Sequence, residues 1–159
     1  MITFPKYLKY EDDVLCISLQ LDSYKTFILG NSSTGKSFMA NRLHAVKQSE
    51  GLQASAKVSF NWDRFYVCLD SRDLADMYEL TDSIILLDRL DFYIDEKLSA
   101  FIRNSNNIFI LISRSGVDGV NTTYENLKVL KVDNINDKLY ITTRYALSSE
   151  VLDEELQEF

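Results

Sequence analysis

The sequence predicts an α/β fold in which a largely parallel central sheet is layered between helices. Strand-like runs alternate with helical patterns, and two of the runs, 84–87 and 108–112, are apolar throughout. Continuous apolar runs of this length are typical of strands that are buried on both faces of a parallel sheet. The alternation of strands with helices indicates the same three-layer arrangement.

The chain is about one domain long, because it has 159 residues, of which 46% are apolar. We therefore expect a single domain over residues 1–159, with a core at 14–115, a β-hairpin at 124–145 and an acidic tail at 148–159. The tail has the pattern of a short helix with a solvated acidic face.

The first expected elements are two strands and a helix. The β-rich runs 14–21 and 24–29 are separated by Asp22 and Ser23, which indicates a hairpin or two neighbouring strands. Helical spacing then predicts a helix that begins near residue 35 and buries one side. The residues on that side are Met39, Leu43 and Val46.

Further strands and short helices are expected through the rest of the core. Residues 47–64 are mostly polar and predict a long loop with a short strand at 57–60. A strand at 65–69 and a short helix at 73–80 are expected before the apolar strand 84–87. A helix over Ile94 to Ile102 precedes the strand 108–112, and the runs 127–132 and 139–143 predict a hairpin at the edge of the sheet.

Composition narrows the class of protein. A net charge of −7 argues against a broad nucleic-acid-binding face, because phosphate backbones are held by clustered Lys and Arg, so nucleic acid is at most an indirect partner. No run approaches the roughly 20 apolar residues that cross a bilayer, and we expect a cytoplasmic protein without a membrane partner. Cys16 and Cys68 lie in strand-like runs and suit small buried side chains in a reducing compartment.

One motif carries chemistry. Residues 30–37, G-N-S-S-T-G-K-S, fit G-x-x-x-x-G-K-[ST] in full and lie between a strand and a helix, as phosphate binding by this loop requires. Inward backbone N–H groups and a helix N-terminus replace the water around the phosphates. Lys36 is expected to reach the β- and γ-phosphates, and the Ser37 hydroxyl to ligate Mg²⁺. The expected nucleotide-binding residues are Gly30, Asn31, Ser32, Ser33, Thr34, Gly35, Lys36, Ser37 and Phe38.

With this motif the chain resembles the P-loop NTPases, which implies ATP and Mg²⁺ as cofactors. The family's apolar strand ending in an acid that holds Mg²⁺ through water is matched by the strand 84–87 and Asp88. The next strand ends in Ser113 and Arg114. It resembles the strand of the additional-strand ATPases, notably the AAA-like and signal-transduction branches, that carries a sensor of the γ-phosphate. An exposed arginine without a role is the alternative interpretation of Arg114.

The resemblance covers residues 14–115 and has two departures. The glutamate that usually follows the magnesium aspartate is replaced by Arg89, and Asp91 is the acid that could approach the γ-phosphate instead. Lys36, Asp91 and Arg114 are thus the candidate catalytic residues. Loss of a positioned base costs on the order of 10² to 10⁴ in rate, so we expect slow or partner-dependent hydrolysis. The helical lid usual in AAA-type ATPases has no match after Arg114, which predicts weak nucleotide binding.

Three functions remain open at this point. The first is a Mg-ATP-binding switch or accessory ATPase that works with a protein partner or by self-association. The second is a small-molecule kinase, because acids and Arg72 follow the strand at 65–69. The third is an interaction protein that keeps the P-loop fold without binding a nucleotide. A GTPase is disfavoured because no Asn-Lys-x-Asp segment follows a strand.

Overall fold

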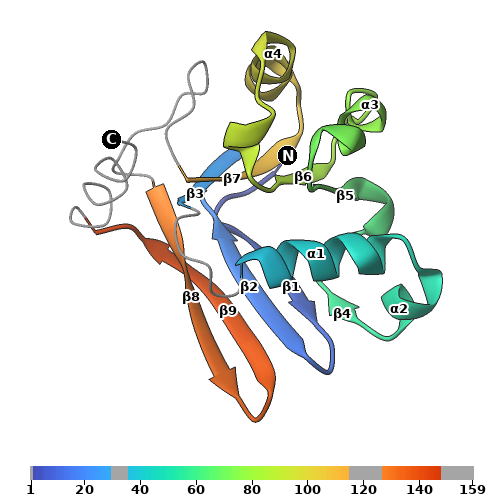
Figure 1. The fold of residues 1–159 in the computed structure, drawn as a ribbon, viewed down its shortest axis with the longest axis vertical. Coiled ribbons are helices and arrows are strands. Elements are labelled where there is room, and N and C mark those ends of the chain that lie inside the picture. Colours follow the sequence, from blue (N-terminus) through green and yellow to red (C-terminus); the bar gives the residue numbers. More distant parts are fainter. Residues whose placement is uncertain (1, 30–35, 115–126, 148–159) are drawn as a thin grey trace.

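A single mixed sheet of nine strands forms the body of the molecule (Figure 1). The computed structural model describes residues 2–29, 36–114 and 127–147. The strand order is β4-β1-β2-β9-β8-β3-β7-β6-β5. The strands are β1 Lys6–Glu11, β2 Leu15–Leu21, β3 Lys25–Leu29, β4 Lys57–Val58, β5 Phe65–Cys68, β6 Ile84–Leu87, β7 Ile108–Ser113, β8 Leu127–Ile135 and β9 Lys138–Tyr145. The helices are α1 Lys36–Lys47, α2 Glu50–Ala54, α3 Leu74–Met77 and α4 Glu96–Asn104, with 3₁₀ turns η1 Trp62–Arg64, η2 Ser71–Asp73 and η3 Leu90–Phe92.

The prediction of a three-layer fold with a largely parallel central sheet is wrong. Antiparallel pairs, β1 with β2, β1 with β4 and β8 with β9, dominate one half of the sheet, in which β2 and β9 pair in parallel, and the whole sheet curls into a half-barrel. Parallel pairing of successive neighbours is continuous only over β8-β3-β7-β6-β5.

The N-terminal strands explain the difference. In β1 and β2 every second residue is buried, which is the pattern of a sheet with one solvated face rather than of a strand covered on both sides. β2 pairs with β1 and β9, so the predicted hairpin or neighbouring pair of 14–21 with 24–29 is also wrong.

The predicted hairpin near the C-terminus exists, but not where it was expected. β8 and β9 pair antiparallel across a two-residue turn. Instead of lying at the edge of the sheet, the hairpin lies inside it, because β9 pairs with β2 and β8 pairs with β3. It therefore joins the antiparallel half of the sheet to the parallel half. Residues 124–126 of the prediction and the predicted tail helix at 148–159 lie outside the described residues.

The parallel half follows the sequence prediction closely. β6 has the expected bounds, and β7 ends one residue later than expected. The helix expected at 73–80 is shorter, and the loop expected at 47–64 contains α2, β4 and η1. Within the described residues, no helix combines the length and the apolar character needed to cross a membrane.

Two hydrophobic clusters fill the space on the two faces of the sheet. One face closes around α1, whose Met39, Leu43 and Val46 are buried as predicted against residues of both halves. The opposite face of the parallel strands is covered by α4 and the α3 region through Leu98, Ile102 and Met77. The parallel strands are thus held from both sides, and their carboxyl ends meet at one edge.

Candidate functional site

The carboxyl ends of β3, β7 and β6 meet at one edge of the sheet, which is where open α/β sheets bind ligands. Leu29, the last residue of β3 and the residue before the motif, is in register with Ser113 at the end of β7. Leu87, at the end of β6, is in register with Leu111. β7 therefore lies between the strand that leads into the motif and the strand that ends before Asp88.

The motif itself is described only at its end. Gly30, Asn31, Ser32, Ser33, Thr34 and Gly35 lie outside the described residues. Lys36 is the first residue of α1, so the helix begins at the same edge, where its first N–H groups have no partner within the helix. Ser37 and Phe38 are exposed on this turn, and the Ser37 carbonyl accepts a hydrogen bond from Asn41 Nδ2 (2.8 Å).

Asp88 is a buried carboxylate directly after β6, with 4% of its surface exposed. Its backbone N–H donates to the Cys68 carbonyl (2.9 Å), which extends the pairing of β6 with β5. Ile84 and Leu86 pack in the cluster around α1, and alternation assigns Asp88 to the same face of the sheet. The Asp88 carboxylate is thus assigned to the face of the sheet that α1 covers.

Asp91, three residues after Asp88 in the chain, forms an ion pair with Arg114. Arg114 Nε lies 3.5 Å from Asp91 Oδ2, and the Arg114 backbone N–H donates to Asp91 Oδ1 (3.5 Å). The Arg114 guanidinium also lies over the Phe92 ring, 4.8 Å from its centroid. Arg89 has a left-handed backbone (φ 52°), and its Nε is 3.9 Å from Asp88 Oδ2. The structure thus pairs Asp91 with Arg114 and Asp88 with Arg89, after the ends of the neighbouring strands β7 and β6.

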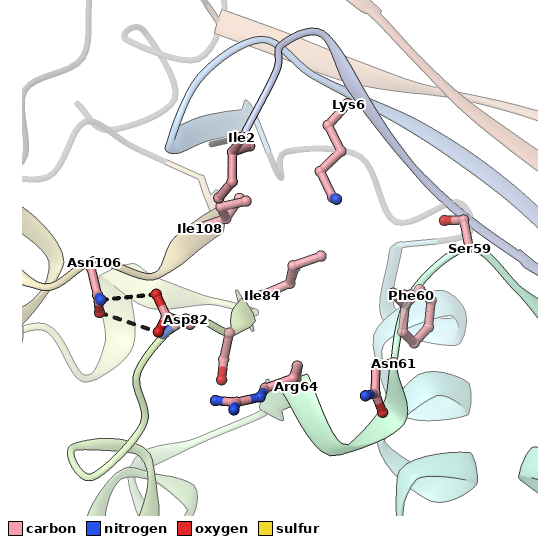
Figure 2. A pocket seen from close by; sticks show the side chains of 11 residues that line it. Ile2, Lys6, Ser59, Phe60, Asn61, Arg64, Asp82, Ile84, Asn106 and Ile108 are labelled. Carbon is pink, nitrogen blue, oxygen red and sulfur yellow. Dashed lines mark hydrogen bonds between the residues drawn. The ribbon is translucent and has the colours of Figure 1, made fainter.

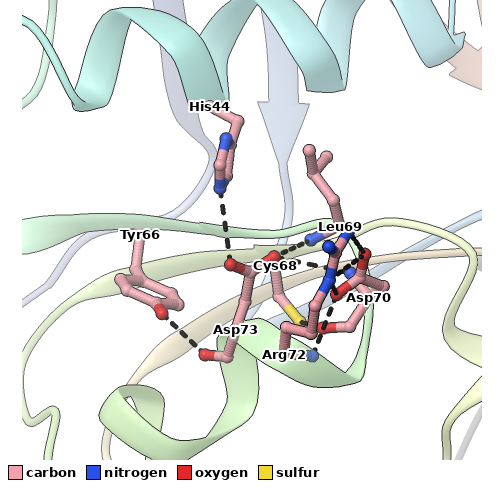
Figure 3. A network of polar contacts seen from close by, with 7 residues as sticks. All are labelled: His44, Tyr66, Cys68, Leu69, Asp70, Arg72 and Asp73. Atoms are coloured by element: carbon pink, nitrogen blue, oxygen red, sulfur yellow. Dashed lines mark hydrogen bonds and ion pairs between the residues drawn. The ribbon is translucent and has the colours of Figure 1, made fainter.

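The acids after β5 belong to a separate network (Figure 3). Asp73 Oδ2 accepts hydrogen bonds from the backbone N–H groups of Leu69 (2.8 Å) and Asp70 (3.4 Å), and Asp73 Oδ1 lies 3.4 Å from His44 Nε2. Arg72 Nη2 lies 2.6 Å from Asp70 Oδ2, and this hydrogen bond lowers the pKa of Asp70 to about 2. Because these groups cap the η2 turn and tie it to α1, the network gives no support to the kinase alternative.

Tyr93 is the residue of this edge that sequence reasoning missed. Its hydroxyl donates to the Asp88 carbonyl (2.6 Å) and so fixes the turn that carries Asp88. Burial raises the pKa of the Tyr93 phenol, and burial likewise raises the pKa of the neighbouring Cys68 thiol to about 12. The Tyr93 phenol and the Cys68 thiol are therefore both uncharged at neutral pH. A tyrosine five residues after an acid has no characteristic spacing that could have identified it.

The residues at this edge fit a magnesium ion that is bound together with a nucleotide. Asp88 and the Ser37 hydroxyl offer the oxygen ligands that Mg²⁺ prefers. Within the parts of the chain that the structure describes, no three His, Cys, Asp or Glu side chains form a metal-binding group. This is compatible with Mg²⁺ in nucleotide sites, which takes most of its ligands from phosphates and water.

Comparison with known proteins adds no assignment. No protein-family model matches the chain, and no curated protein matches it significantly. Function is therefore inferred from the residues of this chain alone.

Proposed function

We propose that this chain binds Mg-ATP at the loop 30–37 and acts as a nucleotide-dependent switch or accessory ATPase with slow or partner-dependent hydrolysis. One observation carries the proposal: a complete G-x-x-x-x-G-K-S motif lies in the sequence between the end of β3 and the first turn of α1, and the buried carboxylate of Asp88 directly follows β6 in the same set of parallel strands. The strand β3 before the motif and the helix α1 after it supply the context that phosphate binding requires.

Each side chain at this edge has a role that follows from its chemistry. The Lys36 ammonium would bind the β- and γ-phosphates, while Ser37 and Asp88 would hold Mg²⁺, Asp88 through water. The bound ion would neutralise charge on the phosphates. β7 is an additional strand between β3 and β6, and this arrangement supports the resemblance to the additional-strand ATPases. Arg114, at the end of β7, would sense the γ-phosphate.

Slow hydrolysis is supported by the groups around Asp88. Arg89 stands where the usual glutamate would orient the attacking water. Asp91 is the nearest alternative acid, but Arg114 engages both of its carboxylate oxygens. A carboxylate whose two oxygens are both engaged is less free to orient an attacking water. We therefore assign Asp91 to positioning Arg114 in the isolated chain, and propose that a partner or a second copy completes the catalytic site.

Calorimetric titration tests the proposal. We expect weak ATP binding, micromolar to millimolar, that tightens in the presence of Mg²⁺. Asp88→Asn should bind ATP in EDTA as the unaltered protein does. The factor by which Mg²⁺ tightens ATP binding should be at least about tenfold smaller in this variant, because the neutral amide is a poorer Mg²⁺ partner. Asp133→Asn, an exposed acid on β8, is the matched control. No heat with ATP, ADP or GTP at millimolar concentration would instead support an interaction protein that binds no nucleotide.

A further inference from the structure

We propose that a second site, at the amino ends of β5, β6 and β7, binds a small organic carboxylate. A pocket of about 230 Å³ opens there (Figure 2), at the end of the parallel strands opposite to the carboxyl end that precedes Asp88. Its lining comes from residues that directly precede these strands, namely Arg64, Asp82, Ser83 and Asn106, together with Lys6 at the start of β1.

Two cations from separate elements point into this pocket (Figure 2). Lys6 is half-buried, and Arg64 ends η1. Arg64 is exposed, and its Nη1 donates to the Thr81 carbonyl (3.1 Å), which orients the guanidinium. Across residues 2–29, 36–114 and 127–147, neither Lys6 nor Arg64 forms an ion pair. A guanidinium fork is the donor geometry that matches a carboxylate.

The acid of the pocket lining is already engaged. Asn106 Nδ2 donates to Asp82 Oδ1 (2.9 Å), and the Asp82 backbone N–H donates to Asn106 Oδ1 (3.4 Å). The lining therefore carries two positive charges and one negative charge. A carboxylate monoanion would leave the occupied pocket neutral, whereas a phosphate dianion would leave one uncompensated negative charge there and cost more to desolvate.

The rest of the pocket suits the body of a small apolar molecule. Its apolar lining residues are Ile2, Phe60, Ile84 and Ile108. The floor is fixed, because the Ser83 N–H donates to Asn107 Oδ1 (2.9 Å) and the Ile108 N–H donates to the Ser83 carbonyl (2.8 Å). At ~30 Å³ for each water, the volume equals about eight waters, which suits a small organic anion. A fixed pocket with an apolar wall and a few convergent polar groups is the usual form of a small-molecule site.

Benzoate, its neutral analogue benzamide and the dianionic phenyl phosphate are suitable probes. For these titrations the full chain is expressed with a purification tag at its C-terminus, because Ile2, near the N-terminus, lines the pocket. Backbone amide NMR spectra follow Asp82, Ser83 and Asn106 during each titration. We expect benzoate to shift these amides with a Kd of about 1 mM, which is typical of a ligand of this size. Benzamide should bind at least about tenfold more weakly, and phenyl phosphate no more tightly than benzoate.

Variants of the two cations are expected to weaken benzoate binding, and a variant of the acid is expected to strengthen it. Lys6→Gln and Arg64→Gln should each weaken benzoate binding about tenfold, while Lys131→Gln, an exposed lysine on β8, should leave it unchanged. Asp82→Asn should tighten it severalfold, because asparagine tolerates the left-handed backbone of residue 82 (φ 50°) and keeps an acceptor for Asn106. The same spectra report whether each variant is folded.

Three results would overturn the carboxylate site: no amide shifts with benzoate, benzamide binding as tightly as benzoate, or unchanged affinity in both cation variants. Phenyl phosphate binding more tightly than benzoate would overturn the assignment to carboxylates. The site does not depend on nucleotide binding, so Lys36→Ala should bind benzoate like the unaltered protein.

Discussion

Arg89 is the residue on which the proposed slow turnover depends. It follows Asp88, and its backbone is left-handed, with φ 52° and ψ 46°. A residue with a Cβ adopts this conformation at a cost on the order of 1 kcal/mol. The turn therefore holds an unfavourable residue at the position where the ATPases that the motif resembles carry the glutamate that orients water.

Replacing this arginine by glutamate tests its role. Arg89→Glu is expected to raise the ATP turnover of the isolated protein about 100-fold, because a carboxylate next to Asp88 can orient the attacking water. Coupled detection of ADP release at saturating Mg-ATP measures the rate. Arg89→Gln removes the same cation without adding a base and should remain slow. Equal rates in the two variants would contradict the assignment.

Asp12 illustrates how a single residue ties the turn between β1 and β2 to α1. Its carboxylate accepts hydrogen bonds from the Tyr10 hydroxyl, from the Val14 backbone N–H (2.8 Å) and from Arg42 Nε on α1 (2.8 Å). Burial acts to raise the pKa of Asp12, but these donors outweigh burial and hold the pKa below its ordinary value. The turn before β2 is thereby attached to α1.

The lowered pKa sets the direction of a pH effect. Asp12 stabilises the fold above its unfolded pKa, near 3.9, and this stabilisation is lost as the pH falls through the lower folded value. Asp12→Asn should lower the free energy of unfolding by about 2 kcal/mol at pH 7, and the difference should narrow below about pH 4. Urea unfolding at both pH values measures it, with Asp13→Asn, its exposed neighbour, as control. A difference independent of pH would refute this account.

At the scale of elements, the β8–β9 hairpin decides the architecture. Ile135 pairs with Lys138, so the loop has two residues, Asn136 and Asp137. Both have positive φ, 52° and 63°, which is the type I′ turn that suits the twist of a hairpin. The turn lets β9 fold back and pair with β2 while β8 pairs with β3.

This turn should accept a glycine with a gain in stability. Asp137→Gly is expected to raise the free energy of unfolding by about 0.5 to 1 kcal/mol, because glycine adopts the left-handed region without the cost of a Cβ. Thermal unfolding should show a midpoint about 2 °C higher. Asp133→Gly, within β8, should instead lower it, since glycine weakens a strand interior. A lower midpoint for Asp137→Gly would contradict the type I′ assignment.

At the scale of the whole molecule, the elements that could be predicted are those determined by patterns within a few neighbouring residues of the sequence. α1, β6 and β7 were predictable because apolar spacing within a few residues determines which faces are buried. The pairing of β2 with β9 was not, because it joins segments far apart in the sequence. It is supported by contacts such as that of the Gln20 backbone N–H on β2, which donates to Thr143 Oγ1 on β9 (2.9 Å).

The same distinction between local patterns and long-range pairing applies to the residues of the candidate site. Asp88 could be proposed from the sequence, because an acid at the end of an apolar strand is a local pattern. The pairing of Asp91 with Arg114 could not, since it requires β7 to lie beside β6. The cations Lys6 and Arg64 share a pocket only because β1 and β5 are brought together by the curl of the sheet.

Titration of the protein and of Lys36→Ala with Mg-ATP tests the central claim most directly, with Lys131→Ala as the matched control. Loss of a charge-assisted contact to phosphate is worth about 1.5 to 3 kcal/mol, so Lys36→Ala should weaken binding about 10- to 100-fold while Lys131→Ala leaves it unchanged. Equal affinity of the unaltered protein and Lys36→Ala for Mg-ATP would contradict the claim that this loop binds the nucleotide.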